Sequence, residues 1–171
     1  MRNSMLQGLA LLDVQATWSW GITIPAIPGQ GDTRTLTSKC ISTSIPAQTV
    51  EQNKLEAQGG IQLNYAGRRL WDQNWEATFI ETRDASTRDM FLAWIELMRN
   101  PVTGTGAYKS VYAVPVELAL YDDVGLQSRS MKLVNAFPTS LGSGNLDQGN
   151  GIVQYSVQFS YDYVEEKNGA T

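Results

Sequence analysis

The sequence contains no histidine and a single cysteine, Cys40. Without histidine the chain lacks the commonest general base and a frequent metal ligand. One cysteine can form neither an intrachain disulfide nor a cysteine-cluster metal site, and it is consistent with a reducing compartment without requiring one.

Charge is also scarce. Charged residues make up 18% of the 171 residues, with 13 basic and 17 acidic side chains and a net charge of −4, against roughly 25% charged residues in ordinary soluble proteins. The cores of protein interfaces are depleted in charge, so this composition favours surface buried between copies. A basic stripe that would grip phosphate backbones is missing, since Arg68-Arg69 is the only adjacent basic pair.

Long hydrophobic runs are missing too, and no segment is apolar enough to span a membrane. Residues 5–12 are apolar but short, and Asp13 follows them without a small-residue cleavage site. We therefore expect residues 1–13 to form an N-terminal arm or short helix rather than a signal peptide. Residues 14–164 are predicted to form one domain, and residues 165–171 a flexible C-terminal tail.

One convincing long helix is present, over residues 84–100. Ser86 and Asp89 have the spacing of a capping box, and Pro101 stops the helix. Its main apolar face holds Met90, Phe91, Trp94, Leu97 and Met98. Leu92 and Ile95 widen the apolar arc toward Arg88 and Arg99. Two interpretations follow: a deeply buried core helix, or a helix that contacts its own sheet and a second subunit.

The remaining periodic segments alternate between apolar and polar residues, as strands do. Strands are predicted over residues 14–24, 33–45, 61–65, 75–79, 108–121, 126–136 and 153–163. The last would span roughly 40 Å, twice an ordinary strand. Pro115 predicts an edge or a bulge, and residues 122–125 a hairpin turn. Residues 47–60 and 137–151 are expected to be loops, the former an interaction element because of its length. The fold class is mainly β (α+β): an antiparallel barrel or sandwich capped by one helix.

Catalytic and cofactor motifs are not found. Gly142-Ser143-Gly144 lacks nucleophile-elbow spacing, and Gly104-Thr105-Gly106 does not continue into a phosphate-binding loop. Residues 147–151 look superficially like a calcium loop but lack its final glutamate. Glu76, Glu81, Asp84 and Asp89 could include a catalytic pair, although helix capping and solvated strand faces explain them more simply. We expect no enzyme activity, no metal and no cofactor, and the tryptophans are expected in the core or at subunit contacts.

Several stretches together resemble one family. Residues 39–46 with Val50-Glu51, then residues 63–69, Asp72 and residues 75–79, are similar to consecutive strands of tail tube proteins of contractile-tailed phages. Asp84-Ala85, Arg88, Phe91 and Trp94 resemble that family's helix, and residues 136–139, 146–147 and 159–163 resemble its C-terminal third. The likeness runs from about Lys39 to Val164, whereas residues 142–151 do not resemble the family closely.

The resemblance implies hexameric rings that share an inner sheet and stack into a hollow tube inside a contractile sheath. The implied partners are copies of the chain, the sheath protein, and baseplate, tape measure and tail terminator proteins. DNA would pass through the lumen without specific binding, in a virion assembled in the host cytoplasm. Tubes of phage-tail-like bacteriocins and type VI secretion are similar and remain an alternative.

Within that picture the segment 47–60 and the N-terminal arm are expected to reach the adjacent ring, with Gln48, Val50, Gln52 and Lys54 as contacts. The helix is expected to face the sheath or a neighbouring subunit through Arg88, Leu92, Ile95 and Arg99. Two rivals stay open: a monomeric β-barrel that holds a small apolar ligand, and a hydrolase that uses Glu76 or Glu81 with an aspartate.

Overall fold

The protein is mainly antiparallel β with one long helix, as the sequence predicts. The structure, a computed structural model, describes residues 15–27, 34–144, 146 and 148–169. None of the helices in these ranges is long and apolar enough to cross a membrane. The elements are β1 Trp20–Thr23, α2 Arg34–Lys39, β2 Cys40–Thr43, β3 Gln48–Ala57, β4 Ile61–Trp71, β5 Asn74–Ile80, α3 Ser86–Met98, α4 Lys109–Tyr112, β6 Val114–Tyr121, β7 Gln127–Leu141, β8 Gln154–Ser160 and β9 Tyr163–Asn168.

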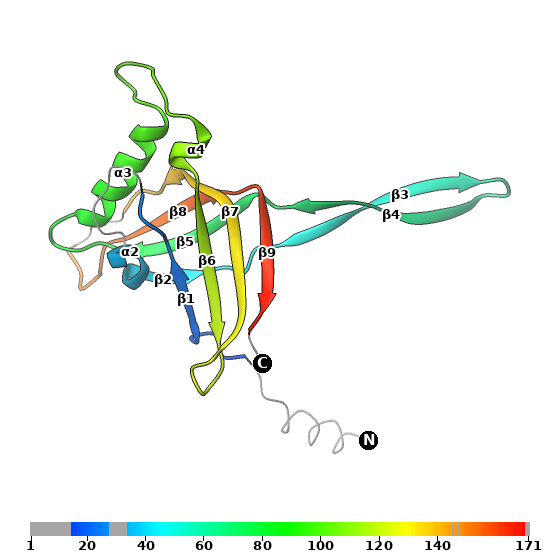
Figure 1. The fold of residues 1–171 in the computed structure, drawn as a ribbon, viewed down its shortest axis with the longest axis horizontal. Helices are drawn as coiled ribbons and strands as arrows, with labels where there is room; N and C mark the ends of the chain where they lie inside the picture. Colours follow the sequence, from blue (N-terminus) through cyan, green and yellow to red (C-terminus); the bar gives the residue numbers. More distant parts are fainter. Residues whose placement is uncertain (1–14, 28–33, 145, 147, 170–171) are drawn as a thin grey trace.

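Strand β7 organises the main sheet. The strand order is β1-β6-β7-β8-β5-β2, with β9 also pairing with β7, while β3 and β4 pair only with each other. The first part of β7 pairs with β6 and β9, and its last residues, from Phe137 to Leu141, pair with β8. Asn135, at the change of partner, has φ 55°. The bend turns one sheet into two crossing layers that enclose the core (Figure 1).

Helix α3 covers this core with one face. Thr87, Phe91 and Trp94 are buried, and the Phe91 ring lies 5.0 Å from that of Phe79. The indole N–H of Trp94 donates to the backbone oxygen of Tyr112 at 2.8 Å, which satisfies the one polar group of that buried side chain. The expected capping helix is therefore confirmed, with its main apolar face inward.

The start of α3 differs from the prediction. The helix begins at Ser86 and ends at Met98 rather than spanning residues 84–100, and its N-cap is Ala85, with φ 55°. The capping box is wrong because Ser86 lies inside the helix, where its hydroxyl accepts a 2.6 Å hydrogen bond from Lys39. The Glu81 carboxylate caps the helix instead, accepting from the backbone N–H groups of Thr87 at 3.1 Å and Arg88 at 3.0 Å. Burial raises the pKa of Glu81, but hydrogen bonds from the backbone N–H groups of Thr82, Arg88 and Thr87 outweigh this effect and hold the pKa below its ordinary value.

The N-terminal strands are shorter than expected. Of residues 14–24, the strand comprises Trp20–Thr23, and Trp18 is 77% exposed instead of facing the core. Residues 34–39 of the second predicted strand form α2, because helical geometry places Leu36 in the core and Lys39 beside Ser86. This burial overrides the β propensity of the threonines. The predicted arm, residues 1–13, lies outside the described residues.

The segment 47–60 is a strand and a turn rather than a loop. Residues 48–57 form β3, and β4 continues to Trp71 instead of ending near Tyr65. The alternation is hard to recognise because a register shift between Val50 and Gln52 changes the phase of the side chains. The two strands form a β-hairpin that extends away from the body (Figure 1).

The C-terminal half contains further differences. Residues 109–112 form α4, and residues 137–141 of the predicted loop belong to β7. The predicted 40 Å strand is wrong: it breaks after Ser160 into β8 and β9, and β9 pairs with β7 as far as Asn168, through residues assigned to the tail. The bulge at Pro115 and the turn at residues 122–125 are confirmed.

Candidate assembly interface

The β3–β4 hairpin has no buried residue along either of its strands. Its strands contain 10 and 11 residues, so it extends roughly 33 Å at about 3.3 Å per residue. It pairs with no other strand among the described residues. A two-stranded ribbon is marginally stable in water unless something packs against it. The hairpin is therefore a candidate for contact with another molecule.

Its outer half has one apolar and one polar face. The register pairs Asn53 with Tyr65, Leu55 with Leu63 and Ala57 with Ile61, and directly paired residues share a face. On this apolar face Leu55 is 54%, Ile61 62%, Leu63 41% and Tyr65 54% exposed. The opposite face presents Gln52, Lys54, Glu56, Gln62, Asn64 and Ala66. A contiguous exposed apolar surface of this kind marks an interaction site.

The root of the hairpin is fixed to the body. The Gln48 side chain accepts a hydrogen bond from Arg69 and donates one to Glu166 of β9. The Arg69 guanidinium lies 4.6 Å from the centre of the Trp71 ring. Beyond the bulge, Gly67 allows close packing, because a Cβ there would lie 3.0 Å from the backbone oxygen of Glu51. The ribbon is thus held in a defined direction at its base.

The residues predicted for inter-ring contact all lie on β3. The Gln48 side chain is already hydrogen-bonded to Arg69 and Glu166 at the hairpin root. Val50 is 52% exposed, and Gln52 and Lys54 are exposed on the polar face. The apolar face of the β3–β4 hairpin was not predicted from the sequence. Its signal was present, since the alternation at residues 61, 63 and 65 is mirrored at 55 and 57 across Gly59-Gly60. Both glycines have positive φ, as a tight hairpin turn favours.

Three of the four candidate residues, Arg88, Leu92 and Ile95, form a stripe on α3 next to its buried face. Arg99 follows as the C-cap residue, with an extended backbone. Leu92 is 37% exposed, Ile95 and Arg88 are half-buried, and Arg99 is exposed. The Arg88 guanidinium lies 5.4 Å from the centre of the Tyr155 ring. This side of α3 and its C-cap offer two partly exposed aliphatic side chains and two cations.

A groove opens where the main sheet does not close. The edge groove lies between Trp20, Leu118 and Leu120 of β1 and β6 on one side and Thr43, Ser44 and Ile45 on the other, with residues 15–17 completing its wall. Its volume is about 380 Å³ and none of its lining residues is charged. Strands β1 and β2, at the two ends of the strand order, flank it.

The two outer sheet faces differ in charge. Glu117, Lys132 and Glu165 are paired across β6, β7 and β9, so that face carries charges of both signs. The outer face of β5 and β8 presents mostly neutral polar side chains, Asn74, Thr78, Gln154, Ser156, Gln158 and Ser160, together with the carboxylate of Glu76. A wall that is mostly neutral and carries no cation does not attract phosphate strongly.

The carboxylates considered for catalysis have separate structural roles. Glu76 accepts a hydrogen bond from Ser156, Glu81 caps α3, and Asp84 accepts one from Thr82. Among the described residues no group of three or more histidine, cysteine, aspartate or glutamate side chains is placed to hold a metal ion. Asp147 of the possible calcium loop lies outside those residues.

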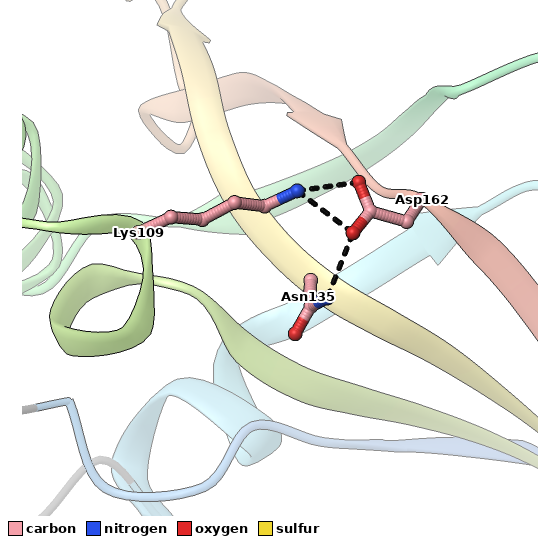
Figure 2. Close-up of polar contacts among 3 residues, drawn as sticks. All are labelled: Lys109, Asn135 and Asp162. Carbon is pink, nitrogen blue, oxygen red and sulfur yellow. Dashed lines mark hydrogen bonds and ion pairs between the residues drawn. The ribbon is translucent and has the colours of Figure 1, made fainter.

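A polar network fixes the corner between the two layers (Figure 2). The Lys109 ammonium at the start of α4 donates to both carboxylate oxygens of Asp162, at 2.6 and 2.7 Å, and the Asn135 side chain donates to the same carboxylate at 2.7 Å. The backbone N–H of Asp162 donates a hydrogen bond to the backbone oxygen of Val134 at 3.0 Å. The network therefore ties the bend of β7 to the break between β8 and β9.

Replacing Asp162 by Asn should lower the free energy of unfolding at pH 7 by about 1 kcal/mol, the upper range for a partly exposed ion pair. The hydrogen bonds from Lys109 and Asn135 hold the pKa of Asp162 below its ordinary value. This stabilisation is complete above the unfolded-state pKa, near 3.9, and is lost as the pH falls through the folded-state pKa. Urea denaturation at several pH values should show the wild type and Asp162→Asn converging below about pH 4.

The matched control is Asp123→Asn in the exposed β6–β7 turn. It should change the stability by less than about 0.5 kcal/mol at any pH. Equal losses for the two variants, or a loss for Asp162→Asn that does not shrink in acid, would show that the network does not stabilise the corner.

The chain is similar to known proteins both in sequence and in structure. A sequence model of the family described as "Phage tail tube protein" matches residues 15–166. No curated protein sequence matches the chain.

Three solved structures illustrate the structural similarity. A chain of the anti-feeding prophage cap, described as a tube terminating cap, has a TM-score of 0.69 at 17% identity, over 92% of this chain and 93% of that one. A chain of the sheath/tube terminator of an extracellular contractile injection system, PVC, has a TM-score of 0.68 at 16% identity, over 92% and 99%. A chain of the PVC sheath–tube complex has a TM-score of 0.64 at 15% identity, over 95% and 97%. At these identities the similarity establishes a shared fold.

Proposed function

Because the chain belongs to the phage tail tube protein family, we propose that it is the subunit of the inner tube of a contractile phage tail. Copies associate into hexameric rings, and the rings stack into a hollow tube. The observation that carries this proposal is the β3–β4 hairpin, whose apolar face is left in water by a single copy. Assembly covers that face.

The tube is proposed to conduct DNA from the virion through the host envelope. The net charge of −4 and the outer face of β5 and β8, which is mostly neutral apart from Glu76, support a lumen that binds DNA weakly. The proposed partners are the sheath, baseplate, tape measure and tail terminator proteins, and assembly takes place in the host cytoplasm. The role is structural, with no enzymatic step.

A tube of a phage-tail-like bacteriocin or of a secretion system is the second candidate. The similarity in fold to chains from extracellular contractile injection structures favours it. Both candidates use the same ring and stack, and they differ in the cargo of the lumen. Purified particles that contain encapsidated DNA would favour the phage tail.

Two surfaces are assigned within the tube. Val50, Gln52 and Lys54 on β3 are proposed to contact the adjacent ring, together with the arm at residues 1–13, while Gln48 holds the hairpin root. The stripe of Arg88, Leu92 and Ile95 on α3, with Arg99 at its C-cap, is proposed to face the sheath. The two arginines suit an acidic partner surface, and Leu92 and Ile95 supply apolar contact.

Negative-stain electron microscopy and size-exclusion chromatography of the purified chain test the proposal. We expect sixfold annuli or hollow rods, in equilibrium with a subunit of 18.9 kDa. The monomeric ligand-binding barrel predicts a single species of that mass. A chain that stays folded and monomeric at high concentration, and after seeding with preformed tubes, would overturn the tube proposal.

A further inference from the structure

We propose that the apolar face of the β3–β4 hairpin docks into the edge groove of a neighbouring copy. This inference rests on the proposed tube assembly and identifies both surfaces of one contact. The protruding surface is Leu55, Ile61, Leu63 and Tyr65, and the recessed surface is the groove between β1, β6 and the segment after β2.

The groove has the chemistry of an apolar receptor. Leu118 forms part of its wall with 1% exposure, Trp20 and Leu120 are half-buried, and Ile45 stands 62% exposed at its rim. An exposed isoleucine beside an apolar cavity is the arrangement expected at the edge of an interface core. Uncharged lining means that an apolar occupant can enter without stripping water from an ion.

The hairpin has the matching chemistry. Leu55, Leu63 and Ile61 lie in adjacent pairs of the ribbon and have no charged neighbour on their own face. The charged side chains Lys54 and Glu56 point to the other face, so neither of them enters the groove when the apolar face docks.

A hairpin that fills the groove must come from a second copy. Ile45 at the groove rim is three positions before Gln48, where the hairpin begins, and Gln48 is held at the root by Arg69 and Glu166. From that root the ribbon extends away from the body (Figure 1). Its tip therefore cannot turn back into the groove of its own chain.

The geometry also suits a closed ring. The donor and receptor surfaces are different, so the contact is heterologous, and such contacts generate rings when the rotation closes. Strand β2 at the rim has β5 as its one partner among the described strands. A neighbouring hairpin laid beside it would cover this open edge, which otherwise invites uncontrolled pairing.

Introducing opposite charges at two exposed positions, one on each proposed surface, tests the contact. Ile45→Glu and Leu63→Lys are each expected to reduce the assembled fraction at least about tenfold, because each places an unpaired charge against an apolar surface. The double variant should recover assembly, because the two charges meet across the interface. Both positions are exposed, so the thermal midpoint of the isolated subunit should stay within a few degrees of the wild type.

The matched control combines Ile45→Glu with Gln62→Lys, which places the same charge on the opposite face of the ribbon. Because that face does not enter the groove, it should not recover assembly. Assembly is measured by sedimentation and by electron microscopy in parallel with the wild type.

The outcomes separate this inference from the proposed function. Wild-type chains that form no rings or rods would refute the tube itself. If the wild type assembles, normal assembly of Ile45→Glu would overturn the docking inference. Equal recovery of assembly when Ile45→Glu is combined with Gln62→Lys or with Leu63→Lys would overturn it too. The inference is also overturned if adding Leu63→Lys to Ile45→Glu does not recover assembly. That result is expected when another segment, such as residues 1–14, occupies the groove.

Discussion

A subunit in which residues 49–70 are replaced by an Asn-Gly dipeptide should be a stable monomer. Gln48 and Trp71 pair directly at the hairpin root, and a two-residue Asn-Gly turn suits such a pair. None of the removed residues belongs to the buried core. The variant loses the whole donor surface, so its association constant should fall by about a hundredfold or more, as for removal of an interface hot spot. Analytical ultracentrifugation measures the association, and electron microscopy should show neither rings nor rods.

The control keeps the hairpin and changes its polar face with Gln62→Ser, because Gln62 pairs with Glu56 and not with the proposed contacts Gln52 and Lys54. The Gln62 side chain is exposed and points away from the apolar face, so assembly should stay within about twofold of the wild type. The thermal midpoint of the shortened variant should match that of the wild-type monomer within a few degrees, because its core is unchanged. Full-length tubes from the shortened variant would show that the hairpin does not assemble the protein.

The parts of the fold that the sequence predicts well are those where one face meets the core. Strand β5 alternates Trp75, Ala77 and Phe79 inward, and β8 does the same with Tyr155, Val157 and Phe159. Helix α3 follows from its 3.6-residue period and the nearby Pro101. In each case burial imposes a regular pattern on neighbouring residues, so a local signal is sufficient.

The parts that the sequence does not predict depend on contacts between distant residues. The bend of β7 at Asn135 and the break after β8 are tied together by Asp162 and by Lys109, which is 53 positions away. The cap of α3 comes from Glu81, beyond its predicted start. Such contacts produce no periodic pattern in the sequence. The local pattern alone therefore predicts one long C-terminal strand and a serine cap.

The sequence predicts where the candidate interface lies in the chain, but it predicts only some of the side chains that form it. The resemblance and the length of segment 47–60 identify the region that projects from the body. Its apolar face becomes evident once Leu55 is paired with Leu63 and Ala57 with Ile61. The edge groove could not be predicted, because Trp20, Ile45 and Leu118 are brought together only by the strand order.

Replacing Phe159 by Ala should lower the free energy of unfolding by about 3–5 kcal/mol, the usual cost of removing a fully buried phenyl ring. Phe159 is 0% exposed. Its ring lies 5.3 Å from Trp75, 6.1 Å from Phe91 and 6.1 Å from Trp94, so one side chain joins β5, β8 and α3. The cavity left behind has rigid aromatic walls that cannot collapse easily, which favours the upper end of the range.

Urea denaturation followed by tryptophan fluorescence measures this change directly, because Trp75 and Trp94 flank the removed ring. The thermal midpoint should fall by about 10 °C, given roughly 2–4 °C per kcal/mol in a chain of this size. Phe137→Ala is the matched control: Phe137 is half-buried and contacts the Tyr112 ring at 5.3 Å. It should lose less than half as much stability, since less apolar surface returns to water. Equal losses for the two variants would mean that the aromatic cluster around Phe159 is not the centre of the core, and that α3 is held to the sheet by other contacts.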